Sequence, residues 1–80
     1  MDQWVYYTEL LLHGIDEQRF IGIFSTTELA HEACWKHSQL REYPLIDPIT
    51  WQPMGDSIHG KQDGSDDTYR VMPIEIDVAI

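Results

Sequence analysis

The stretch RFIGIFSTTELAHEACWKHSQL, residues 19–40, predicts a β-strand that runs directly into an α-helix. Ser25 is a favourable helix N-cap, and Glu28 stands where its carboxylate can reach back to the Ser25 amide as a capping box. Phe24 and Leu29 are spaced to close a hydrophobic staple across the same turn. The junction therefore predicts a strand followed at once by a capped helix.

The helix predicted over residues 26–41 has one broad apolar stripe. Its members are Leu29, Ala30, Ala33, Cys34, His37 and Leu40. Because these positions recur at helical spacing, we expect them to pack on one face of a sheet, with Trp35 near the edge of that contact.

Segments on either side of this junction predict the other strands. Residues 3–13 are rich in aromatic and branched side chains on both faces, which is typical of a central strand or of one covered partly by a partner. A short connection at 14–18 would join them to 19–24 as an antiparallel hairpin. Residues 49–51 could add a short edge strand, and 68–80 alternate as a last strand. We expect an α+β protein of order β-β-α-(β)-β, with three or four antiparallel strands and one helix on one face.

Three local features qualify this prediction. Gly22 in mid-strand indicates a bulge or a close neighbour, and Pro73 indicates an edge or a bulge because it cannot donate to a ladder. Residues 54–67 are rich in Gly, Asp and Ser, which predicts a long, mobile acidic loop. The whole chain, residues 1–80, is short enough for a single domain.

Acidic residues dominate the chain, with 14 Asp and Glu against 5 Lys and Arg and a formal net charge of -9. Direct binding to nucleic acid is disfavoured, because phosphate binding depends on Lys and Arg. The acidity has two interpretations. It can keep the protein soluble through self-repulsion, or it can form a surface that binds a basic protein partner.

The cellular location is inferred from what the chain lacks. No apolar run approaches the roughly 20 residues that a membrane helix needs, and the first residues lack the basic start and apolar centre of a signal peptide. Cys34 is the only cysteine, so no intramolecular disulfide can form, which fits a reducing compartment. We therefore expect a cytoplasmic protein that does not bind membranes.

Motifs for metal binding and catalysis are few. His31, Cys34 and His37 form an H-x2-C-x2-H pattern, the best candidate for a metal site. A helical projection separates the two histidines by about 120°, and no CxxC or HExxH motif supplies further ligands. The alternative interpretation is a core histidine and a buried thiol. Because no GxGxxG, P-loop or GxSxG motif is present, we expect neither a cofactor nor an enzyme, and we assign no catalytic residue.

Aromatic residues are more numerous than one helix can cover on a sheet of this size. An uncovered aromatic face often marks a protein interface, although the Pro-rich residues 41–53 and the acidic loop could instead fold over it. The residues expected to contact a partner are Trp4, Tyr6, Trp35, Trp51, Tyr69, Asp63, Asp66 and Asp67. We therefore expect a non-enzymatic, acidic protein-interaction module, with a homodimer as one form of it. The alternative is a small-ligand or metal-binding domain with a cleft between Trp35, Trp51 and the loop.

Several motifs also resemble those of a family. FIGIFST leading into ELAHEA, an extended segment at Tyr43 and Pro44, and the final YRVMPIEID resemble a group of short, uncharacterised bacterial and phage proteins. Their shared core has a strand-to-helix junction of the form I-G-[IV]-[FY]-S. The resemblance covers roughly Trp4–Tyr43 and the last strand, and it implies a β-β-α-β core. Because many members come from mobile elements, it also implies an accessory or host-interaction role, with no catalytic residues.

Overall fold

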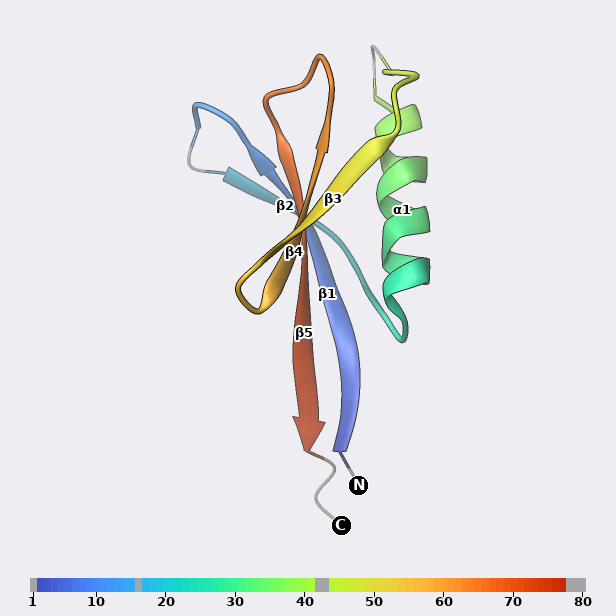
Figure 1. Ribbon diagram of the computed structural model, residues 1–80, viewed down its shortest axis with the longest axis vertical. Helices are drawn as coiled ribbons and strands as arrows, with labels where there is room; N and C mark the ends of the chain where they lie inside the picture. Colours follow the sequence, from blue (N-terminus) through green and yellow to red (C-terminus); the bar gives the residue numbers. More distant parts are fainter. Residues whose placement is uncertain (1, 16, 42–43, 78–80) are drawn as a thin grey trace.

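The computed structural model describes residues 2–15, 17–41 and 44–77, and within them five strands form a sheet with one helix beside it (Figure 1). The elements of these residues are β1 (Asp2–Leu12), β2 (Glu17–Phe24), α1 (Thr27–Gln39), β3 (Ile49–Met54), β4 (Ser57–Gln62) and β5 (Thr68–Asp77). The strands form one antiparallel sheet in the order β2-β1-β5-β4-β3. The helix α1 packs on β2, β1 and β5, and the start of β1 pairs with the end of β5 in an arm that extends past the helix (Figure 1).

The core lies between α1 and the face of the sheet toward it, which we call the inner face. Leu10, Cys34 and Tyr69 form the centre of this core. One register line crosses the sheet here, because Leu10 pairs with Tyr69, Tyr69 with Gly60 and Gly60 with Trp51. Residues opposite in register share a face. All four therefore lie on the inner face, and the opposite face is called the outer face.

The number of strands differs from the sequence prediction. The α+β class, the antiparallel sheet, the central position of β1 and the edge position of β3 are confirmed, but the sheet has five strands rather than three or four. The additional strand, β4, lies within residues 54–67, which were predicted to form a long mobile loop. Gly55 has a φ of 65° and forms a two-residue turn with Asp56, so that Met54 pairs with Ser57. Glycine at the first central position suits a tight hairpin turn, so the chain reverses at once instead of forming a loop.

The helix begins one residue later than predicted. Its N-cap is Thr26 rather than Ser25, and the Thr26 hydroxyl oxygen accepts a hydrogen bond from the Leu29 amide at 3.2 Å. Leu29 is therefore the third helical residue, and the capping box predicted for Ser25 and Glu28 is wrong. Both hydroxyl residues are suitable caps, so local preference does not choose between them.

The buried face of α1 is narrower than the predicted stripe. Ala30, Cys34 and Ser38 are buried at a spacing of four residues, whereas Leu29 and Leu40 are exposed. A straight helix meets a twisted sheet along a narrow line, so side chains at the margins of the stripe stay in solvent. The small side chains on this line allow α1 to lie close to the inner face.

A β-bulge in β2 changes which side chains face the helix. The register between β1 and β2 shifts at Glu9, which pairs with Phe20, so that Ile21 is the extra residue. Ile21 packs against the core, whereas Phe20 and Ile23 lie exposed on the outer face. The sequence predicted a bulge or a close neighbour at Gly22; the bulge lies at the adjacent Ile21, and the Phe24 ring lies close to Gly22.

Pro73 lies in β5, the middle strand of the sheet. The pairing with β1 runs along the whole of β5, but β4 pairs only with Tyr69–Val71. Among the described residues, Pro73 thus has no pairing partner on the β4 side, as expected for a residue that cannot donate to a ladder. The last three residues of the strand predicted over 68–80 lie outside the described residues, as do Glu42 and Tyr43 near the predicted helix end.

Candidate functional site

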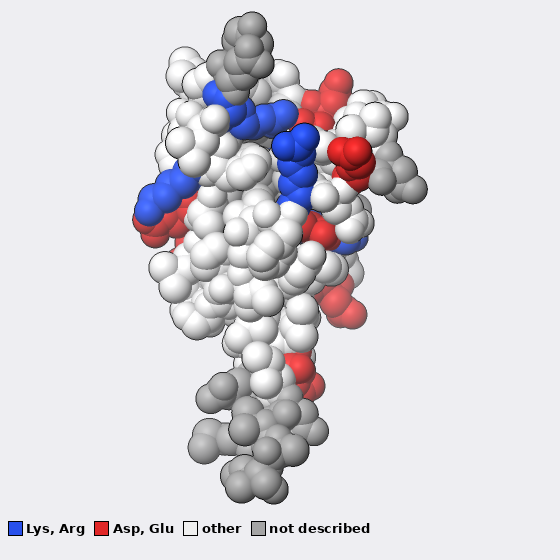
Figure 2. Space-filling model, turned by 180° about the vertical axis from the view of Figure 1, so that it is seen from behind, with Lys and Arg blue, Asp and Glu red and all other residues white. Residues whose placement is uncertain are grey.

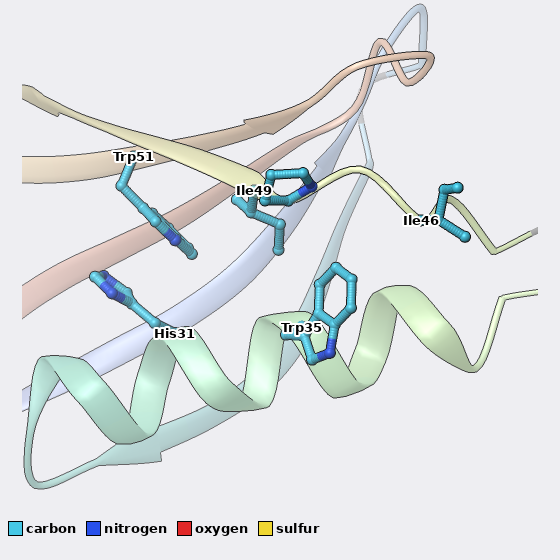
Figure 3. Close-up of a pocket in the computed structure, with 6 residues that line it drawn as sticks. His31, Trp35, Ile46, Ile49 and Trp51 are labelled. Carbon is cyan, nitrogen blue, oxygen red and sulfur yellow. The ribbon is translucent and has the colours of Figure 1, made fainter.

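A cleft of about 270 Å³ lies between α1 and the edge strand β3 (Figure 3). Its walls come from the helix, from β3 and from the segment before β3, and its lining residues are His31, Trp35, Ile46, Pro48, Ile49 and Trp51. Figure 3 shows Trp51 pointing from β3 toward His31, while Trp35 rises from the helix toward Ile49. We call this site the α1–β3 cleft.

Trp51 is held in the cleft by two contacts. Gly60, opposite it in register on β4, leaves room for the indole, since a Cβ on Gly60 would lie 2.6 Å from Trp51 Cζ3. The His31 ring stacks on Trp51, with centroids 4.1 Å apart and ring planes inclined by 12°. Contacts from β4 and α1 thus fix the orientation of an aromatic side chain on an edge strand.

His31 contributes an uncharged ring to the cleft wall. Its Nε2 atom is buried and has no hydrogen-bond partner among the described residues. Burial lowers the pKa of His31 below its ordinary value of 6.5, and this effect outweighs the opposing attraction of the Glu28 carboxylate. The imidazole is therefore neutral at pH 7, and its protonation would be disfavoured by the same burial.

The charge around the cleft favours cations. No Lys or Arg is among the described residues that line it, and the exposed Asp47 stands between the lining residues Ile46 and Pro48. Indole faces attract cations through their quadrupole, and a chain of net charge -9 raises the local concentration of positive groups. The cleft therefore combines apolar aromatic walls with an environment suited to a positively charged group.

The aromatic residues predicted to form an uncovered sheet face lie on the inner face instead. Trp4 and Tyr6 alternate in phase with Leu10 and belong to the arm formed by β1 and β5. Tyr69 is only 2% exposed, so it cannot contact a partner. Strand register, which local sequence pattern does not reveal, places Trp4 and Tyr6 on the same face as the helix, where Trp4 stays 51% exposed. From that set, the structure places Trp35 and Trp51 together as lining residues of the α1–β3 cleft.

The predicted acidic contacts also separate into two kinds. Asp63 and Asp66 are exposed, but the Asp67 carboxylate accepts hydrogen bonds from Arg41 at 2.6 Å and from the His13 backbone N–H at 2.9 Å. Burial alone would raise the pKa of Asp67, but these two donors hold it below its usual 3.8. Asp67 therefore ties the β1–β2 hairpin to the end of α1 and is not a free acidic contact.

The metal alternative is not supported by the geometry. His31 stacks on Trp51, Cys34 is buried in the core, and His37 Nδ1 lies 3.1 Å from the Tyr69 hydroxyl. Among the described residues, no three His, Cys, Asp or Glu side chains gather in a group that could hold an ion. Burial raises the pKa of the Cys34 thiol to about 12, which also disfavours the thiolate that a metal would need.

Two features relevant to function were missed by sequence reasoning. Ile46, Pro48 and Ile49 complete the cleft in place of the predicted acidic loop, because the chain before β3 passes beside the helix. On the outer face, the buried Glu9 accepts hydrogen bonds from two guanidinium nitrogens of Arg70, one of them Nε at 2.7 Å. The partners are 61 residues apart, so no local pattern could reveal the pair.

In residues 2–15, 17–41 and 44–77, no helix is both long and apolar enough to cross a membrane. Comparison of the chain with protein families, curated proteins and solved structures gave no match.

Proposed function

We propose that this protein is a non-enzymatic interaction module that binds a basic segment of a protein partner in the α1–β3 cleft. The observation that supports this most directly is the meeting of Trp35 and Trp51 in a cleft with no basic lining residue among those described. Tryptophan is the typical anchor of protein interfaces, and an Arg or Lys side chain could stack on either indole. The net charge of -9 adds attraction for a basic partner and repels nucleic acid.

The edge of β3 provides the means to hold such a segment. Among the described residues, β3 pairs with β4 on one side and with no strand on the other, so the backbone N–H and C=O groups of its free edge are open to an added strand. Pro53 lacks an N–H and limits pairing to the part of β3 before it. A bound segment would therefore be short and extended, with alternate side chains directed toward the cleft.

Peptide selection tests this proposal. A random peptide library is selected on the immobilised protein, and the recovered sequences are titrated calorimetrically into the wild type and into the Trp35→Ala and Trp4→Ala variants. Trp35 and Trp4 are 39% and 51% exposed, so each variant removes a similar side chain without opening the core. We expect peptides with Arg or Lys beside apolar residues, and an affinity loss of roughly tenfold or more in Trp35→Ala only.

The outcomes that contradict the proposal are equally specific. Selected peptides without basic residues would remove the charge argument, and peptides that bind Trp35→Ala as tightly as the wild type would place the site elsewhere. Affinity should also fall as salt is raised, because at 0.1 M salt the attraction between exposed charges is largely screened beyond about 10 Å.

Small-ligand binding is the second candidate for the same cleft. Its volume of about 270 Å³ approaches the roughly 300 Å³ at which small-molecule sites begin, and its walls are mostly apolar. A thermal-shift screen separates the two functions, since a ligand at about 100 times its Kd adds about 2.7 kcal/mol of stability. A screen of metabolites and nucleotides that produces no shift would retire this candidate.

A homodimer is a further form of interaction, and the outer face is the surface we assign to it. Phe20, Ile23, Ile74 and Ile76 are exposed there. The arm is a two-stranded ribbon, which is marginal in water unless another element covers it, and a second copy would bury the same apolar side chains on both chains. Light scattering at low and high salt tests this, because salt screens the repulsion between two chains of charge -9. A monomer under both conditions would reject the dimer.

A further inference from the structure

A second cavity, of about 330 Å³, lies between the β1–β2 hairpin and the C-terminal end of α1. It shares no lining residue with the α1–β3 cleft. Its lining residues are Leu10, Leu12, Arg19, His37, Leu40 and Arg41. We call it the arginine pocket.

The arginine pocket is basic although the chain as a whole is acidic. It contains two of the 5 Lys and Arg residues of the chain. Figure 2 views the molecule from behind, and on the face it shows the basic side chains lie mainly in the upper half. The β1–β2 hairpin and the C-terminal end of α1 lie at the same height in Figure 1. The pKa of His37 is lowered by burial and then by the charges of Arg41 and Arg19, which places both guanidinium groups close to this ring.

The basic groups retain capacity for a ligand. Arg19 is exposed on β2 and forms no ion pair among the described residues, not even with Glu17 two residues away. Arg41 pairs with Asp67 through Nη2, which uses only part of the five N–H donors of the guanidinium group. That pair also shows that a carboxylate is accepted at this position.

The remaining lining groups define the rest of the ligand. His37 Nδ1 is hydrogen-bonded with the Tyr69 hydroxyl at 3.1 Å, so the other ring nitrogen is the one left for a ligand. Leu10, Leu12 and Leu40 provide apolar surface beside the arginines. A phosphate alone would leave this surface without a partner, whereas an apolar body joined to a carboxylate would cover it.

We propose that the arginine pocket binds a small organic carboxylate, whose charged group is held by Arg19 and Arg41 and whose apolar body contacts the three leucines. The site is independent of the α1–β3 cleft and of the basic segment proposed to bind there. The ligand is defined by this chemistry, a single carboxylate on a small aliphatic or aromatic body.

Benzoate is a suitable probe, with benzamide as its neutral isostere and inorganic phosphate as a charged group without an apolar body. Each is titrated into the ¹⁵N-labelled full chain at constant ionic strength. We expect saturable shifts around His37 and Leu12 with benzoate, and an affinity weaker by about tenfold or more for benzamide, since hydrogen bonds to a charged group are stronger than those to a neutral one. Phosphate should also bind more weakly than benzoate.

Matched variants locate the site. Arg19→Gln should weaken benzoate binding by about tenfold, while Lys61→Gln, which removes the same charge from an exposed position on β4, should change it by less than about twofold. Trp35→Ala should leave benzoate binding unchanged. Equal binding of benzamide and benzoate, equal losses in Arg19→Gln and Lys61→Gln, or tighter binding of phosphate would each overturn the proposal.

Discussion

Substitution of Gly60 by alanine tests the packing that positions Trp51 in the α1–β3 cleft. A Cβ on Gly60 would lie 2.6 Å from Trp51 Cζ3, 2.8 Å from Trp51 Cε3 and 2.7 Å from Ile49 Cγ2. Carbon atoms pack at about 3.5–4.0 Å, so both neighbours must move by roughly 1 Å. Trp51 cannot move freely, because His31 stacks on the same indole.

The expected loss of stability follows from two opposing effects. Overpacking costs about 1–3 kcal/mol, and the smaller conformational entropy of alanine in the unfolded chain returns about 0.4–1 kcal/mol, so the net cost is centred near about 1.3 kcal/mol. Urea unfolding measures it directly. In a thermal melt, each kcal/mol corresponds to roughly 4–8 °C in Tm for a domain of this size. The NMR signals of the His31 ring protons should also shift as the stacked indole moves.

Gly22→Ala is the matched control, because Gly22 is also a strand glycine with an aromatic neighbour. A Cβ there would meet only the far end of the Phe24 ring, at 2.7 Å from Cζ and 2.9 Å from Cε2, and Phe24 lies on the edge strand β2 where its ring can swing away. We expect a cost below about 0.5 kcal/mol. A Gly60→Ala variant as stable as the wild type, or equal costs at the two glycines, would refute this account of how Trp51 is held.

Three further predictions concern buried polar groups. Arg70→Met should lower the free energy of unfolding in urea by roughly 3 kcal/mol, because it leaves the 1% exposed Glu9 carboxylate unpaired. The double variant Glu9→Gln/Arg70→Met should recover most of that loss. A double variant whose loss equals the sum of the two single losses would contradict the pairing. Burial lowers the pKa of His31, so the unfolded chain binds more protons than the folded one, and stability should fall as the pH drops from 6.5 toward the folded pKa. His31→Phe should reduce this dependence of the urea midpoint on pH. A smaller dependence of the same sign should remain from His37, whose pKa is also lowered. Burial raises the pKa of Cys34 to about 12, so Ellman's reagent should label it only after denaturation, and rapid labelling of the native protein would count against a buried thiol.

The cleft was partly predictable. Trp35 and Trp51 could be named as neighbours because one was expected at the margin of the helix contact and the other in an edge strand beside it. Gly60 could not be recognised as their support, because β4 has no apolar alternation: a glycine stands where an inward side chain would be expected, and its neighbours His59 and Lys61 point to the outer face. Only the register with β3 shows that the Trp51 ring occupies the space above Gly60.

Local sequence patterns predict the α+β class, the hairpin of β1 and β2, the strand-to-helix junction and the alternation of β5, because these depend on hydrophobic period and on turn chemistry between near neighbours in the chain. The remaining features depend on long-range packing. This packing selects Thr26 over Ser25 as the helix cap, places Trp4, Tyr6, Trp51 and Tyr69 on the inner face, pairs Glu9 with Arg70 and brings Arg19 and Arg41 to one pocket. These outcomes depend on strand register and on contacts between residues far apart in the chain, and a shift of one residue in register would reverse the face of every side chain in a strand.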